Sequence, residues 1–163
     1  MKLLRTLFLG LAMATAVFGA TAAQAGPDVN VSSGFTVKGP GLAVHGYDVV
    51  AYFTEAEPTV GRAKFSTVHN DATYRFASRA NLEAFEANPE KYVPQYGGFC
   101  AYGVAVGAKF DGDPRLWKIV DGKLYLNLNE EIQATWEEDI PGHVEDADDN
   151  WRKIAHKTPA ELS

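Results

Sequence analysis

Cys100 is the residue with the clearest chemical potential, because it is the only cysteine in a chain of 163 residues. It follows the turn-forming pair Gly97-Gly98 and precedes Ala101 to Val106, which predicts a short helix. A thiol at a helix N-terminus has a lowered pKa, because backbone N–H groups and the helix dipole stabilise the thiolate. We therefore predict an ionisable thiol near the surface, either as the reactive centre of a redox protein or as a metal ligand. A small apolar side chain packed among aromatic neighbours is the alternative that stays open.

Histidines are the other candidate ligands, and none of them has a local chelating spacing to Cys100 or to another histidine. They stand at positions 45, 69, 143 and 156. A metal site would therefore have to be assembled by the fold. His45, beside Gly46-Tyr47-Asp48, is the strongest candidate for a ligand or a base, whereas the other three fit solvated surface positions. The predicted metal ligands are Cys100 and His45, and a thiolate favours copper or another soft metal.

Several other chemistries lack their sequence signatures. The chain has no C-x-x-C pair, so a redox reaction at Cys100 would need a small thiol or another partner to resolve it. It also lacks a G-x-S-x-G elbow, a phosphate-binding glycine loop and a metalloprotease histidine pair. The acidic run at 145–149 has neither the glycine nor the spaced final Glu of a calcium loop, and it is typical of a solvated helix face. A further set of polar and aromatic side chains fits either a pocket beside the thiol or core packing: Tyr47, Asp48, Tyr52, Tyr96 and Tyr102.

The first 25 residues predict a secretory signal peptide cleaved near Ala25. Lys2 and Arg5 precede an apolar run of about 13 residues, and a small-residue stretch follows it. The apolar run is too short to span a bilayer as a helix. We expect the mature protein in the periplasm or secreted, without stable membrane insertion. Cleavage removes two of 15 basic residues and none of 21 acidic ones, so the net charge moves from −6 to −8. That charge disfavours nucleic acid or an anionic membrane surface as a partner. The partners expected for Cys100 are a metal ion or a small thiol.

Hydrophobic patterning predicts a single compact α+β domain at residues 42–157, preceded by a flexible arm at 26–41. Asn70-Asp71 and Asp121-Gly122 separate alternating apolar runs and predict two hairpins in an antiparallel sheet. Ser78 predicts the cap of a helix that ends at Asn88-Pro89. Apolar residues repeat every three to four positions from Ile132 to Ile154, which predicts two amphipathic helices on the sheet, interrupted at Pro141-Gly142.

The predicted strand and helix, from residues 74–78 through residues 85–92, resemble the YHS domain, a small metal-associated module related to TRASH modules. A longer pattern is similar to exported bacterial YHS-domain proteins and covers nearly all of the mature chain. It comprises Gly46-Tyr47-Asp48, Val50 to Phe53, Tyr96 to Tyr102, Trp117-Lys118-Ile119 and Asn150-Trp151.

This resemblance implies soft-metal binding or redox chemistry at Cys100, because some relatives carry selenocysteine at the matching position. The sequence also differs from metal-binding members of that family. Metal-binding relatives place cysteines at the corner between strand and helix, where this chain has Ala77 and Asn81. The hypotheses are therefore a copper-binding domain that uses Cys100 and His45, a thiol-dependent redox protein, or a structural or partner-binding domain with an inert thiol.

Overall fold

The computed structural model describes residues 28–32 and 41–162. The predicted signal peptide lies outside the described residues, as does most of the predicted arm. The strands are β1 (Val31–Ser32), β2 (Leu42–Ala43), β3 (Arg62–His69), β4 (Ala72–Phe76), β5 (Asp113–Val120) and β6 (Lys123–Asn127). The α-helices are α1 (Ala51–Thr54), α2 (Arg79–Ala87), α3 (Ala101–Ala105), α4 (Glu130–Glu138) and α5 (Ile140–Ile154). Short 3₁₀ turns complete the chain: η1 (Val44–Gly46), η2 (Pro89–Lys91), η3 (Gln95–Gly98) and η4 (Pro159–Leu162).

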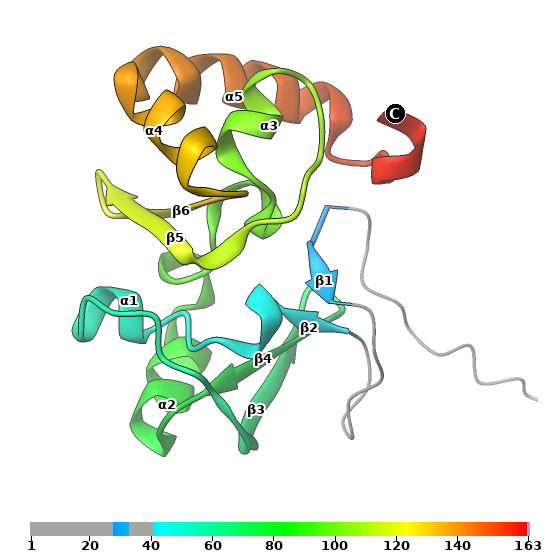
Figure 1. Ribbon diagram of the computed structural model, residues 1–163. Helices are drawn as coiled ribbons and strands as arrows, with labels where there is room; N and C mark the ends of the chain where they lie inside the picture. Colours follow the sequence, from blue (N-terminus) through cyan, green and yellow to red (C-terminus); the bar gives the residue numbers. More distant parts are fainter. Residues whose placement is uncertain (1–27, 33–40, 163) are drawn as a thin grey trace, which may run out of the picture.

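The strands and helices confirm an α+β fold, but the prediction of one antiparallel sheet is wrong. β1, β2, β4 and β3 form one sheet in that order, and β5 and β6 form a separate two-stranded sheet. Within the first sheet, β2 runs parallel to β4 through the pairing of Leu42 with Thr73. The β5–β6 hairpin lies between the helices α3, α4 and α5 and the four-stranded sheet with α1 and α2 (Figure 1).

Both predicted hairpins are confirmed, with the turns at the predicted residues. Asn70 and Asp71 have φ of 48° and 57°, and Asp121 and Gly122 have φ of 50° and 73°. Two successive residues with positive φ give a turn whose twist matches that of the flanking strands. Asn, Asp and Gly tolerate this conformation better than other residues, so the local sequence determines both turns.

β6 is the central strand of the molecule, because its two faces belong to two different hydrophobic cores. Leu124 and Leu126 are fully buried in the core formed with the four-stranded sheet and α2. Tyr125, between them, packs into the core formed with α3, α4 and α5, where its ring lies 5.4 Å from that of Trp136. The alternation of side chains along a strand therefore joins the two halves through a single element.

The helices follow the predicted caps, with one shift. Ser78 caps α2 by accepting a hydrogen bond from the Asn81 N–H at 3.1 Å. The break between the last two helices falls at Asp139, not at Pro141-Gly142 as predicted. Pro141 lies in the first turn of α5, where its missing N–H has no intrahelical partner to lose, and the Asp139 carboxylate caps Gly142 at 3.1 Å. α5 packs mainly against α3 rather than on the sheet.

Candidate functional site

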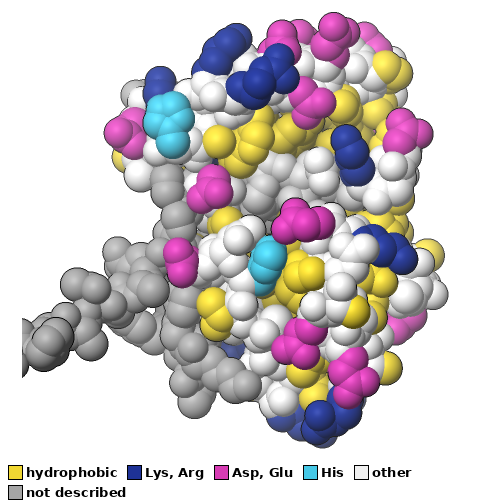
Figure 2. Space-filling view, turned by 180° about the vertical axis from the view of Figure 1, so that it is seen from behind, with side chains coloured by type: hydrophobic (Ala, Val, Ile, Leu, Met, Phe, Trp, Pro, Cys, Tyr) yellow, Lys and Arg dark blue, Asp and Glu magenta, His cyan; other side chains and the backbone are white. Residues whose placement is uncertain are grey.

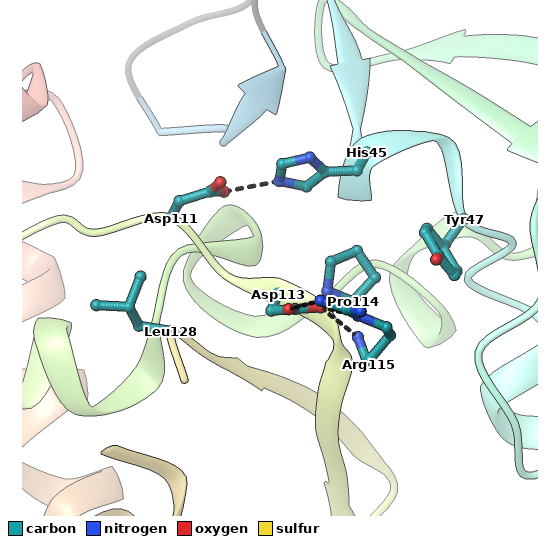
Figure 3. Close-up of a pocket in the computed structure, with 7 residues that line it drawn as sticks. All are labelled: His45, Tyr47, Asp111, Asp113, Pro114, Arg115 and Leu128. Atoms are coloured by element: carbon teal, nitrogen blue, oxygen red, sulfur yellow. Dashed lines mark hydrogen bonds and ion pairs between the residues drawn. The ribbon is translucent and has the colours of Figure 1, made fainter. Parts of the chain in front are cut away.

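An open pocket of about 350 Å³ lies between the η1 turn and the start of β5. Its lining residues are His45, Tyr47, Asp111, Asp113, Pro114, Arg115 and Leu128. His45 faces the carboxylate of Asp111 across this space, whereas Arg115 pairs with Asp113 on the same strand, β5 (Figure 3). In the space-filling view, the surface is hollowed between the two halves of the molecule (Figure 2).

His45 is held at the pocket by a left-handed turn of three residues. Val44, His45 and Gly46 have φ of 48°, 50° and 81°. A β-branched valine at positive φ is rare, and such a conformation costs about 1–3 kcal/mol per residue. The surrounding fold compensates by burying Val44 and by the hydrogen bond from the Tyr47 N–H to the Val44 carbonyl at 2.9 Å. The strained turn leaves the imidazole of His45 on the surface.

Asp111 is the partner of His45, and sequence reasoning missed it. His45 Nε2 lies 2.9 Å from Asp111 Oδ1, and the side chains are 38% and 54% exposed. Asn30 Nδ2 donates to the same carboxylate oxygen at 2.6 Å and to the Gly98 carbonyl at 3.2 Å. The only signal at Asp111 was its place in the turn-rich segment Asp111-Gly112-Asp113-Pro114, which nothing in the sequence connects with His45.

The other wall of the pocket is an ion pair at the start of β5. Arg115 donates to both carboxylate oxygens of Asp113, from Nε at 3.0 Å and from a terminal nitrogen at 2.6 Å. The side-chain hydrogen bond from Arg115 is the main reason that the pKa of Asp113 is lowered. Behind this pair, the buried Tyr52 hydroxyl donates to the Pro114 carbonyl at 2.7 Å. Both contacts fix the backbone that carries Arg115.

Cys100 lies at the helix N-terminus as predicted, and of the two alternatives left open the structure favours the packed side chain over the exposed, ionisable thiol. The side chain is fully buried. Its Sγ accepts a hydrogen bond from the Gly103 N–H at 3.4 Å and donates to Asn127 Oδ1 at 3.6 Å. Burial raises the pKa of Cys100, although backbone N–H groups of Gly103, Leu128 and Tyr102 act in the opposite direction. Desolvation of the thiolate outweighs the helix N-terminus here, so the thiol is protonated at neutral pH.

The described residues do not fit the predicted soft-metal site. His45 is hydrogen-bonded to Asp111, whereas the Cys100 thiol is hydrogen-bonded to Asn127 and Gly103. Across residues 28–32 and 41–162, no group of three or more His, Cys, Asp or Glu side chains is placed to hold an ion.

Asp48 fills the corner between strand and helix where the resemblance places cysteines. This carboxylate is fully buried. Its Oδ2 accepts hydrogen bonds from the Ala77 N–H at 2.8 Å and from Asn81 Nδ2 at 2.7 Å. A buried carboxylate therefore joins Ala77 and Asn81 in this corner.

No family model, curated protein or solved structure matches this chain. The assignment to exported YHS-domain proteins therefore stays a prediction from the motifs.

The remaining candidates have mainly structural contacts. The His69 ring packs against Tyr74 and Phe85 and lies 3.4 Å from the Glu90 carboxylate. His143 Nδ1 lies 3.0 Å from the Trp136 carbonyl. Of the tyrosines and the aspartate proposed to line a pocket beside the thiol, only Tyr47 lines the pocket described here.

Proposed function

We propose that this protein is an exported YHS-type binding domain that holds a divalent transition-metal ion at His45 and Asp111. The observation that carries the proposal is the approach of His45 Nε2 to Asp111 Oδ1, 2.9 Å apart beside an open pocket. This proposal keeps His45 as a ligand and replaces Cys100 with Asp111 as its partner.

The separation of the two ligand atoms suits a metal ion. Two atoms that bind one ion at about 2.1 Å each and at a right angle are about 3.0 Å apart. His45 Nε2 and Asp111 Oδ1 are 2.9 Å apart, so an ion can replace their hydrogen bond at this separation once the imidazole and the carboxylate turn toward it. Asn30 supports the geometry by donating to Asp111 Oδ1 at 2.6 Å.

The donor atoms determine the class of metal. An imidazole nitrogen and a carboxylate oxygen favour Cu²⁺, Ni²⁺ or Zn²⁺, whereas Cu⁺ favours sulfur. Cys100 does not offer its sulfur at the surface, because the side chain is fully buried and burial raises its pKa. The proposed ion is therefore of the borderline class rather than a thiophilic one.

Nickel titration of His45 and Asp111 variants tests this function. The protein is expressed from its full coding sequence, and Ni²⁺ binding is measured by isothermal titration calorimetry. His45→Ala and Asp111→Asn are each expected to weaken binding at least roughly 10-fold, because loss of even an outer-shell partner costs this much. His156→Ala, which removes an exposed histidine elsewhere, is the matched control and should bind as wild type. Wild-type affinity in both site variants contradicts the proposal.

Thiol redox chemistry is a second candidate, and one observation favours it. Three backbone N–H groups, from Gly103, Leu128 and Tyr102, lower the pKa of Cys100 against the effect of burial. These N–H groups would stabilise a thiolate if the packing around Cys100 opened to solvent.

Labelling of Cys100 distinguishes the redox hypothesis from an inert thiol. Because the side chain is fully buried, we expect an aromatic disulfide reagent to react with the native protein far more slowly than with the unfolded chain. The rate is followed by absorbance at neutral pH with and without denaturant. Equal rates in the two states would restore the redox hypothesis and contradict the buried position of Cys100.

A further inference from the structure

One end of the molecule is strongly acidic. Residues 130–149, which form α4 and much of α5, contain nine Asp or Glu residues and no Lys or Arg. All nine acidic residues are exposed. Among the described residues, only Glu137 and Asp149 of these nine form ion pairs with a cation. This surface, which we call the acidic face, lies at the end of the molecule opposite β3 and α2 (Figure 1).

The opposite end carries a group of cations, which we call the basic corner. It consists of Arg62 and Lys64 on β3 and Arg79 in the first turn of α2. The sheet brings them together, because Arg62 pairs with Phe76 of β4, and Arg79 follows Phe76 by three residues. All three are exposed, and Lys and Arg side chains gather at this end of the molecule (Figure 2). None of the three forms an ion pair within the described part of the chain, whereas three other cations do.

The basic corner does not serve the stability of the fold. Arg79 stands at the N-terminus of α2, where the helix dipole disfavours a cation, and the first turn has no acidic residue to offset it. Arg62 and Lys64 lie on an edge strand of the sheet, where charged side chains oppose pairing with a further strand. A partner would therefore bind this corner through the cationic side chains rather than by extending the sheet.

The acidic face has the charge that such a partner requires. We propose that the protein associates with a second copy of itself, with the basic corner of each copy bound to the acidic face of the other. Because the two surfaces lie at opposite ends, an antiparallel pair makes the contact twice and closes as a dimer. Each copy has a formal net charge of −6, but repulsion between charges farther apart than about 8 Å is largely screened at physiological ionic strength.

Analytical ultracentrifugation of the protein, expressed from its full coding sequence, tests this inference. At low salt, the weight-average mass is expected to rise with concentration toward twice the mass of the monomer. Exposed ion pairs are weak and screened by salt, so the dissociation constant should increase at least roughly 10-fold between low and high salt.

Charge reversal tests the basic corner. The double variant Arg62→Glu, Lys64→Glu is expected to weaken dimerisation at least roughly 10-fold, because like charges then face each other in both contacts. The matched control is Lys123→Glu, Lys153→Glu, which changes the net charge equally at exposed positions outside the basic corner. This control should dimerise as wild type.

A charge swap tests whether the two surfaces meet. Glu145→Lys, Asp146→Lys reverses two exposed positions of the acidic face and should also weaken dimerisation. An equimolar mixture of this variant with Arg62→Glu, Lys64→Glu is expected to dimerise as wild type, since both contacts then join opposite charges. Recovery in the mixture would also show that both variants are folded.

The remaining outcomes would overturn the inference. A wild-type protein that stays monomeric at low salt has no such contact. Equal weakening in the control variant, or no recovery in the mixture, would show that the basic corner and the acidic face do not bind each other. Assemblies that grow beyond two copies would contradict the closed arrangement. The contact includes neither His45 nor Asp111, so these results are independent of the nickel titration.

Discussion

Replacement of Asp48 by alanine is expected to destabilise the protein by roughly 4–5 kcal/mol, which is a large part of the stability of a typical domain. The carboxylate is fully buried and accepts four hydrogen bonds. Oδ1 accepts the N–H groups of Val50 and Ala51 at the start of α1, at 2.9 and 3.3 Å. Oδ2 accepts hydrogen bonds from the Ala77 N–H and from Asn81 Nδ2, so the carboxylate connects the start of α1 with the corner between β4 and α2. Removal leaves three of these donors without an acceptor, because the Ala51 N–H also donates to the Asp48 carbonyl at 3.2 Å. Hydrogen bonds to a charged group contribute about 1.5–3 kcal/mol each.

Denaturation by urea, followed by circular dichroism, measures this effect. Asp146→Ala removes an exposed carboxylate from α5 and should change stability by no more than about 0.5 kcal/mol. If Asp48→Ala does not fold, Asn81→Ala still tests the network, because it removes only one of the four donors. That variant should lose about 1–2 kcal/mol. An Asp48→Ala protein as stable as Asp146→Ala would show that the buried carboxylate does not hold the corner.

Features determined by neighbouring residues could be predicted from the sequence. Asn70-Asp71 and Asp121-Gly122 supply the positive φ that a hairpin turn needs, and Ser78 supplies the cap of α2. The arrangement of the strands could not be predicted in this way. The parallel pairing of β2 with β4 joins Leu42 to Thr73, and such pairings depend on packing between distant segments.

In the candidate site, too, features set by neighbouring residues could be predicted, whereas contacts between distant segments could not. His45 was predicted as a ligand from its neighbours, whereas Asp111 and Arg115 reach it only through the fold. For Cys100, the helix N-terminus was predicted correctly because it is local. Its burial could not be decided from the sequence, because Asn127 and the Phe110 carbonyl, which contact the cysteine, come from later segments. Desolvation by those segments reversed the expected direction of the thiol pKa.

Lys109 ties the segment before the pocket to the end of α5, and no sequence motif indicated this role. The side chain is only 5% exposed. Its Nζ donates to the carbonyls of Ala155 and Lys157 at 2.8 and 2.6 Å. It also lies 5.0 and 4.8 Å from the ring centres of Phe99 and Trp151. Burial lowers the pKa of Lys109, and the carboxylates of Asp28 and Glu161 oppose that change.

Replacement of Lys109 by methionine keeps most of the apolar stem but removes the charge, so the expected loss is about 2–4 kcal/mol. The carbonyls at the end of α5 would lose a cation that interacts favourably with the helix dipole and donates hydrogen bonds to them. Hydrogen exchange should therefore speed up most in the last turn of α5, while the β5–β6 hairpin stays protected. Lys153→Met is the matched control, because Lys153 is exposed on the same helix. If both variants have wild-type stability and exchange, the carbonyls of Ala155 and Lys157 do not depend on this ammonium.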